Sequence, residues 1–96
     1  MNPSSAIYSK NPDIVFRKIA GETILVPIRN NLASLESIYT LSEVAARIWE
    51  LLDGQTNIRK VKDVIAQEYA VQQETAEKDI SEFLLQAEEL KLITAK

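Results

Sequence analysis

The chain has 96 residues, of which 46% are apolar and 26% are charged, and its formal net charge is −3. This length and balance are typical of one soluble globular domain rather than of a disordered segment. The sequence contains no cysteine and no histidine. Their absence excludes disulfides, thiol chemistry, zinc sites of the common Cys/His kind and histidine acid–base catalysis.

Targeting signals are also missing from the sequence. The amino terminus has no basic segment followed by an apolar run, so it does not resemble a signal peptide. No apolar run approaches the roughly 18 residues that a membrane span needs. We therefore expect a cytoplasmic protein.

The first third of the chain predicts an arm and a β-hairpin. Residues 1–13 are rich in proline, serine and asparagine, which predicts a flexible amino-terminal arm before a domain over residues 14–96. Residues 14–19 and 23–28 are rich in β-branched and aromatic types, and a glycine turn over 20–22 separates them. Two such runs around a turn are typical of a hairpin.

A polar connector and a short strand follow the hairpin. Residues 29–35 predict the connector, and residues 36–40 predict a third strand that leads directly into a helix. Pro27 has no N–H to donate to a ladder, so we expect it at a strand end or on an edge.

The segment 41–54 predicts the central helix. Apolar residues recur at 41, 44, 45, 48, 51 and 52, the helical spacing that leaves one apolar face. Ser42 is a candidate N-cap, and Thr40 with Glu43 is a rival capping box. We expect Gly54 to end the helix and Trp49, the only tryptophan, to anchor the core.

Two further helices complete the prediction. Asn57 is a candidate cap for a helix that runs to about Tyr69, and a third helix is expected over about residues 75–90. Leu92 and Ile93 form an apolar tail. The predicted fold is α+β and winged-helix-like, with a three-stranded antiparallel sheet followed by three helices (βββααα).

One apolar residue of the third helix lies off its core stripe. Leu85 is far around the helix from Ile80, Phe83 and Ala87 at about 100° per residue. It is either a singly exposed leucine, which proteins commonly show, or part of one wall of a groove. In the second case the third strand would form the other wall, with its edge open to a guest strand.

The central helix resembles the signature of the PqqD-like family. The matching residues begin with Tyr39-Thr40-Leu41-Ser42 and continue through Ala45-Ala46-Arg47-Ile48-Trp49-Glu50-Leu51-Leu52-Asp53-Gly54. Further matches are Asn57-Ile58, Ile65, Glu68-Tyr69-Ala70-Val71, Asp79-Ile80, Phe83-Leu84 and Leu92-Ile93. The resemblance spans about residues 14–93, and its Ile-Trp-x-Leu-Leu-Asp-Gly segment is fairly specific.

Three positions differ from the family pattern. Ser42 replaces a common asparagine and Asn57 a common threonine, and both remain competent N-caps. Lys91 stands where a glycine commonly closes the third helix. We therefore expect the last turn to run on or to end less sharply.

This resemblance implies a peptide-recognition element of ribosomally made, enzymatically modified peptides, without catalysis, cofactor or metal of its own. In that family the leader of a precursor peptide adds as a strand to the third strand and enters a cleft beside the third helix. The complex then reaches a modifying enzyme, often a radical S-adenosylmethionine enzyme. Transferred to this chain, the peptide-binding residues are Ser37, Ile38, Tyr39 and Thr40 on the strand, and Lys78, Ser81, Leu84 and Leu85 on the helix.

Other functions fit the residues less well. No nucleophile lies beside a base, and the two glycines cannot form a phosphate loop. A winged-helix nucleic-acid binder is the alternative, with Arg59, Lys60 and Lys62 near phosphates, but the acidic third helix opposes it. A carrier-protein role lacks the Asp-Ser-Leu setting for its prosthetic arm. An open strand edge also leaves homodimerisation open.

Overall fold

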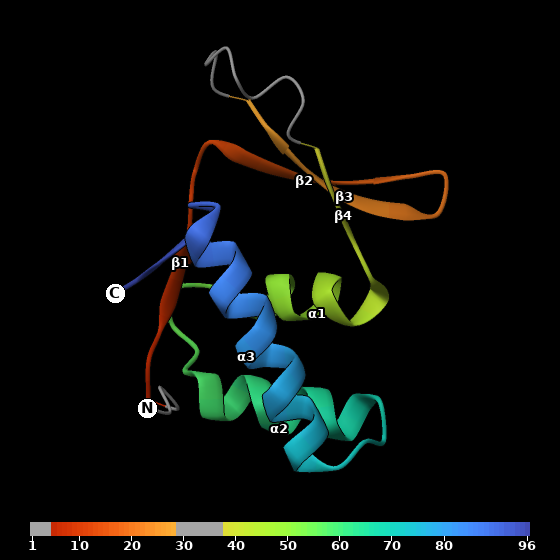
Figure 1. Ribbon diagram of the computed structural model, residues 1–96, viewed down its shortest axis with the longest axis vertical. Helices are drawn as coiled ribbons and strands as arrows, with labels where there is room; N and C mark the ends of the chain where they lie inside the picture. Colours follow the sequence, from red (N-terminus) through yellow and green to blue (C-terminus); the bar gives the residue numbers. More distant parts are fainter. Residues whose placement is uncertain (1–4, 29–37) are drawn as a thin grey trace.

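A computed structural model of the chain describes residues 5–28 and 38–96. Its described part contains three helices and five strands (Figure 1). In chain order they are β1 (Tyr8–Lys10), β2 (Ile14–Ile19), β3 (Glu22–Pro27), β4 (Tyr39–Leu41), α1 (Glu43–Leu51), α2 (Ile58–Glu68), α3 (Gln73–Glu89) and β5 (Ile93–Ala95). The predicted α+β order, a three-stranded antiparallel sheet followed by three helices, is confirmed.

The β2–β3 hairpin closes through a two-residue turn. Ile19 pairs with Glu22, and both Ala20 (φ 52°) and Gly21 (φ 83°) between them have left-handed backbones. Positive φ at both central positions is the geometry of a type I′ turn, whose twist matches that of the flanking strands. Pro27 is the last residue of β3, the strand end that its missing donor predicts.

α1 and α2 begin where their caps predict. The Ala45 N–H donates to the Ser42 hydroxyl oxygen at 3.1 Å, and the Lys60 N–H donates to the Asn57 side chain at 2.9 Å. Ser42, rather than the Thr40/Glu43 capping box, therefore caps α1. α1 ends at Leu51, earlier than the sequence predicts.

Gly54 belongs to the turn that follows α1. It has a φ of 81° and lies beside Asp53, whose carboxylate accepts hydrogen bonds from the N–H groups of Gln55 and Thr56 at 2.9 and 2.8 Å. These bonds hold the pKa of Asp53 below its usual range. The turn thus takes the chain from α1 to the start of α2.

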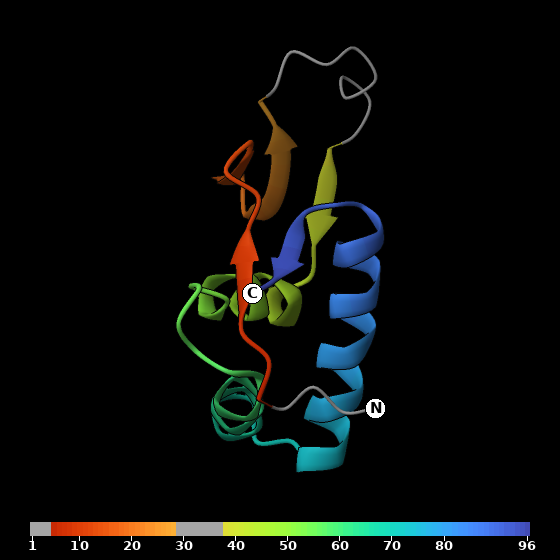
Figure 2. The same ribbon diagram turned by 90° about the vertical axis from the view of Figure 1, so that its left-hand side faces the viewer.

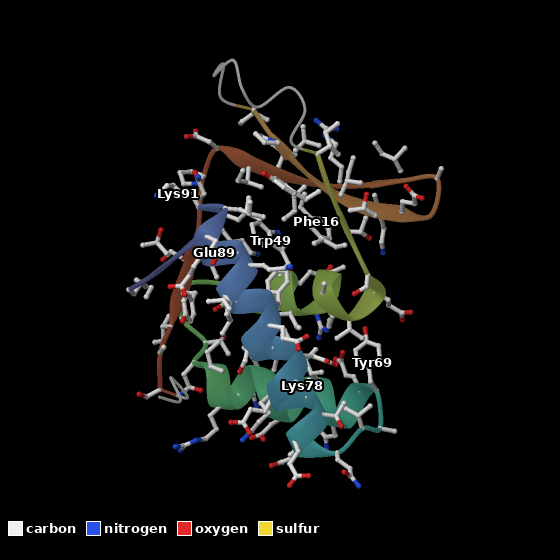
Figure 3. The ribbon with its side chains drawn as sticks, in the orientation of Figure 1. Phe16, Trp49, Tyr69, Lys78, Glu89 and Lys91 are labelled. Carbon is white, nitrogen blue, oxygen red and sulfur yellow. The ribbon has the colours of Figure 1, made fainter. Side chains whose placement is uncertain are left out.

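The core lies between the sheet and the three helices. Trp49 is only 2% exposed and lies between the sheet and the helices in Figure 3. It shares one apolar cluster with Leu25 of the sheet, Val61 of α2 and Ile80 of α3. The predicted anchoring role of Trp49 is confirmed.

The amino-terminal segment differs from the predicted arm. β1 pairs with β5 in a second sheet, in the register Tyr8 to Ala95 and Lys10 to Ile93. Tyr8 is 5% exposed, and the Lys10 ammonium lies 5.3 Å from the centre of the Trp49 ring. Residues 8–10 are therefore an integral part of the domain, because they cover Trp49 and complete the pairing of the carboxyl-terminal strand.

The end of α3 also differs from the prediction. Lys91 takes the left-handed conformation that a glycine would normally supply, with a φ of 61°. The Leu92 N–H donates to the Ala87 carbonyl at 2.8 Å, and the Lys91 N–H donates to the Glu88 carbonyl at 3.0 Å. These two bonds form a Schellman motif, so α3 stops sharply and Leu92 turns into the core at 4% exposure.

No helix within residues 5–28 and 38–96 combines the length and apolar character needed to cross a bilayer.

Candidate functional site

β4 presents an open backbone edge. The sheet order is β2–β3–β4, so β3 occupies one side of β4 and no other described strand occupies the second side. Positions along an antiparallel pair alternate between hydrogen-bonded and non-bonded. The Ile19–Glu22 pair at the tight turn is of the bonded kind. The Ile28 N–H donates to the Asp13 carbonyl at 2.7 Å. This pair is therefore also of the hydrogen-bonded kind, as the alternation counted from the turn requires.

This alternation identifies which backbone groups of β4 are available. Counting from the turn, Thr23 and Leu25 direct their N–H and C=O groups toward β4. They pair with Leu41 and Tyr39, respectively. Thr40 lies between these two pairs, so its N–H and C=O point to the open side, which faces the same side of the molecule as α3 in Figure 2.

A groove of about 540 Å³ begins where β4 ends. We call it the α1–α3 groove, because one wall comes from the start of α1 and the other from one flank of α3. Its lining residues are Ser42, Val44, Ala45, Ile48, Asp79, Glu82, Phe83, Leu85 and Gln86. An open strand edge that continues into a partly apolar groove is suited to an extended peptide.

The strand residues predicted for peptide binding have different environments. Ser37 lies outside the described residues. Ile38 is 54% exposed just before β4, and the alternation points its backbone outward as well. Tyr39 packs against the core, so its side chain faces the domain, whereas the Thr40 side chain is exposed.

The four predicted helix residues are not all at the groove. Leu85 lines it and is 62% exposed. Ser81 and Lys78 are exposed but do not line the groove, and Lys78 lies near the amino end of α3, farther from the sheet than α1 (Figure 3). The prediction for Leu84 needs correction, because this side chain is 4% exposed and belongs to the core.

Four helix residues of the groove were missed. Asp79, Glu82, Phe83 and Gln86 recur at i, i+3, i+4 and i+7, so they share one face of α3. The spacing itself was a usable signal. On a sequence alone, however, the two carboxylates resemble an ordinary solvated helix face.

A second concavity, the hairpin hollow, has a volume of about 490 Å³. It lies between the β2–β3 hairpin and α1, on the other side of the β4–α1 junction. Its lining residues are Phe16, Lys18, Gly21, Glu22, Thr23, Thr40, Leu41, Glu43, Ala46, Arg47, Glu50 and Tyr69. It thus contains both basic and acidic side chains.

The Arg47 side chain in the hairpin hollow is already paired. Its guanidinium donates to both carboxylate oxygens of Glu68 at 2.8 Å and to Glu50 at 3.2 Å. The Glu68 hydrogen bond is the main reason why the pKa of Arg47 is raised, and the same bond lowers the pKa of Glu68. This fork joins α1 to α2 and neutralises the Arg47 charge within the domain.

Neither concavity resembles a metal centre. Within the described part of the chain, no group of three or more acidic residues is arranged to hold a metal ion. The groups that remain unsatisfied at the α1–α3 groove are backbone edge groups and carboxylates. These can bind a partner but do not form a nucleophile–base pair.

The fold and the site define a small α+β domain with an open strand edge beside a helical groove. Residues 22–93 match the family model described as Coenzyme PQQ synthesis protein D (PqqD), and the chain belongs to this family. Proteins of this family are generally non-catalytic peptide-binding proteins. The resemblance seen in the sequence is confirmed.

A solved structure agrees with this assignment. The chain is similar to TbiB1 in its complex with the TbiA(beta) leader peptide, with a TM-score of 0.72 and 26% sequence identity. The similarity covers 88% of this chain and 93% of that chain. No sequence among the curated proteins matches this chain.

Proposed function

We propose that this chain captures the leader segment of a ribosomally made precursor peptide and presents it to a modifying enzyme, expected to be a radical S-adenosylmethionine enzyme. The leader adds to β4 as a further antiparallel or parallel strand. The observation that carries this proposal is the open edge at Thr40 beside the α1–α3 groove, in a chain similar to a protein in complex with a leader peptide. The proposed compartment is the cytoplasm, where such precursors are made.

In strand addition, backbone hydrogen bonds supply affinity and side-chain contacts supply specificity. The outward N–H and C=O of Thr40 supply hydrogen bonds to any extended backbone. A guest side chain on the helix-facing side then meets the apolar α1 wall and Phe83. Of the residues predicted from the sequence, we retain Ser37, Ile38, Tyr39 and Thr40 for the strand and Leu85 for the groove rim.

The experiment uses a display library of random 15-residue peptides selected against the immobilised chain. The enriched peptide is then titrated into the isotopically labelled protein, and amide shift changes are recorded. We expect the largest changes at residues 38–42 and at the groove residues of α3. Changes confined to β2 or α2 would contradict the proposal.

Thr40→Pro is the sharpest test of the edge, because it removes the outward N–H while Tyr39 and Leu41 keep their pairing with β3. We expect affinity for the enriched peptide to fall about tenfold or more, since a hydrogen bond is lost and the proline ring obstructs the guest backbone. Thr40→Ala is the matched control, because it keeps the N–H and should bind within about twofold. Normal binding by a folded Thr40→Pro protein would move the guest to another surface.

A further inference from the structure

The two walls of the α1–α3 groove differ in charge. The α1 wall presents Val44 and Ala45 above the buried Ile48, so it is apolar apart from Ser42. The α3 wall contributes the carboxylates of Asp79 and Glu82. None of the nine lining residues is basic.

These two carboxylates also lack partners within the described part of the chain. No ion pair there joins Asp79 or Glu82 to a lysine or arginine, whereas Glu50 and Glu68 near the hairpin hollow both bind Arg47. Both residues are exposed and lie one helical turn apart on the same face. The groove therefore has a negative wall, and no basic residue lines it.

We infer that the guest peptide carries a lysine or arginine together with an aliphatic or aromatic anchor on its helix-facing side. This inference rests on the proposed function and adds the chemical class of the peptide. Alternate side chains of an added strand point to the same face, so one guest can place a cation against Asp79 and Glu82 and an apolar side chain against Val44 and Phe83.

The charge contributes mainly to selection among peptides. Exposed ion pairs add little affinity individually, but an acidic guest residue at the same position meets two like charges. The difference between a basic and an acidic guest is therefore larger than the gain from either pair alone. It also decreases with added salt, because exposed charges are screened over about 10 Å at 0.1 M.

The test repeats the selection of 15-residue peptides on three proteins. These are the unchanged chain, the double variant Asp79→Asn/Glu82→Gln, and the single variant Glu88→Gln. Glu88 is a matched control, since its charge acts on Tyr8 of β1 and it does not line the groove. We expect lysine and arginine to be enriched on the unchanged chain and on Glu88→Gln, and this enrichment to disappear on the double variant.

Affinities of one enriched peptide and of its Lys→Glu counterpart quantify the effect. The unchanged chain should prefer the lysine peptide by about fivefold to tenfold in 50 mM salt and by less than about twofold in 500 mM salt. The double variant should bind both peptides within about twofold. Equal affinities on the unchanged chain, or a preference that survives the double substitution, would overturn the inference.

The failure of this inference can be distinguished from failure of the proposed function. Peptides that bind in a Thr40→Pro-sensitive manner without a basic residue would overturn only the charge preference. If no peptide depends on Thr40, the proposed function fails as well. Sedimentation would then show whether a dimer that Thr40→Pro disrupts occupies the edge, in which case the occupant is a second copy of this chain and both proposals are overturned.

Discussion

The α1–α3 groove and the hairpin hollow have similar volumes, about 540 and 490 Å³, and share the β4–α1 junction. They differ in the charged side chains that line them. In the hairpin hollow, Arg47 is bound on both sides by Glu50 and Glu68. In the groove, the carboxylates of Asp79 and Glu82 have no ion-pair partner among the described residues. The two concavities therefore have similar volumes but different charges, because basic and acidic side chains line the hairpin hollow, whereas acidic side chains are the only charged residues that line the groove.

The largest expected effect comes from filling each concavity in turn. Ala45 is half-buried in the α1 wall of the groove, so Ala45→Trp should occupy the space of a guest side chain. We expect peptide affinity to fall at least about tenfold, because forced overpacking costs about 1–3 kcal/mol. A calorimetric titration with the enriched peptide measures this loss of affinity.

The matched control fills the hairpin hollow instead. Glu50 is exposed there, and Glu50→Trp should leave peptide affinity within about twofold. A larger loss with Glu50→Trp than with Ala45→Trp would reverse the comparison between the two concavities. Circular dichroism on both variants separates lost binding from lost folding.

A smaller effect is expected at the helix ends near the two concavities. Lys91 after α3 and Ala70 after α2 have φ values of 61° and 52°, a conformation that costs non-glycine residues about 1 kcal/mol. Lys91→Gly and Ala70→Gly should each raise the free energy of unfolding by about 0.5–1 kcal/mol in urea titrations. Lys78→Gly, at an exposed position inside α3 and beyond its first turn, should lower it by a similar amount.

Glycine at either helix end should leave peptide affinity unchanged. If Lys91→Gly weakened peptide binding, binding at the α3 wall would depend on the Lys91 side chain. A lower free energy of unfolding in Lys91→Gly would contradict the assignment of a strained left-handed conformation to Lys91.

The smallest expected effect concerns the ion pair between Arg47, which lines the hairpin hollow, and Glu68. Arg47 lowers the pKa of Glu68, so this pair stabilises the fold above the ordinary glutamate pKa of 4.5 and is lost as pH falls through the lower folded value. Glu68→Gln should therefore lower Tm slightly at pH 7 and have no effect in more acidic solution. Thermal unfolding across this pH range measures the difference.

Peptide binding provides the second measurement on the same variant. Glu68→Gln should not change the affinity, since the side chain lies outside the groove. If the difference in Tm between Glu68→Gln and the unchanged chain grew as the pH fell, the expected pH dependence of the Arg47–Glu68 pair would be wrong in sign.

Local signals in the sequence were sufficient for much of the fold. The glycine turn, the caps at Ser42 and Asn57 and the helical spacing around Trp49 depend on short-range hydrogen bonds and on burial of one face. The family signature lies in the same segment, so the class of protein could also be anticipated. The open edge of β4 was implied by the family resemblance, and the sheet order β2–β3–β4 agrees with it.

The remainder depended on tertiary contacts. The strands β1 and β5 have three residues each, too few to show an alternating pattern, and they pair only because α3 ends at Lys91 and brings Ile93 beside Lys10. Helical periodicity separates the apolar face of α3 from its polar faces, but it does not show which flank is turned toward β4. Packing of α3 on α1 and α2 sets that rotation, which places Asp79 and Glu82 in the groove and leaves Ser81 and Lys78 outside it.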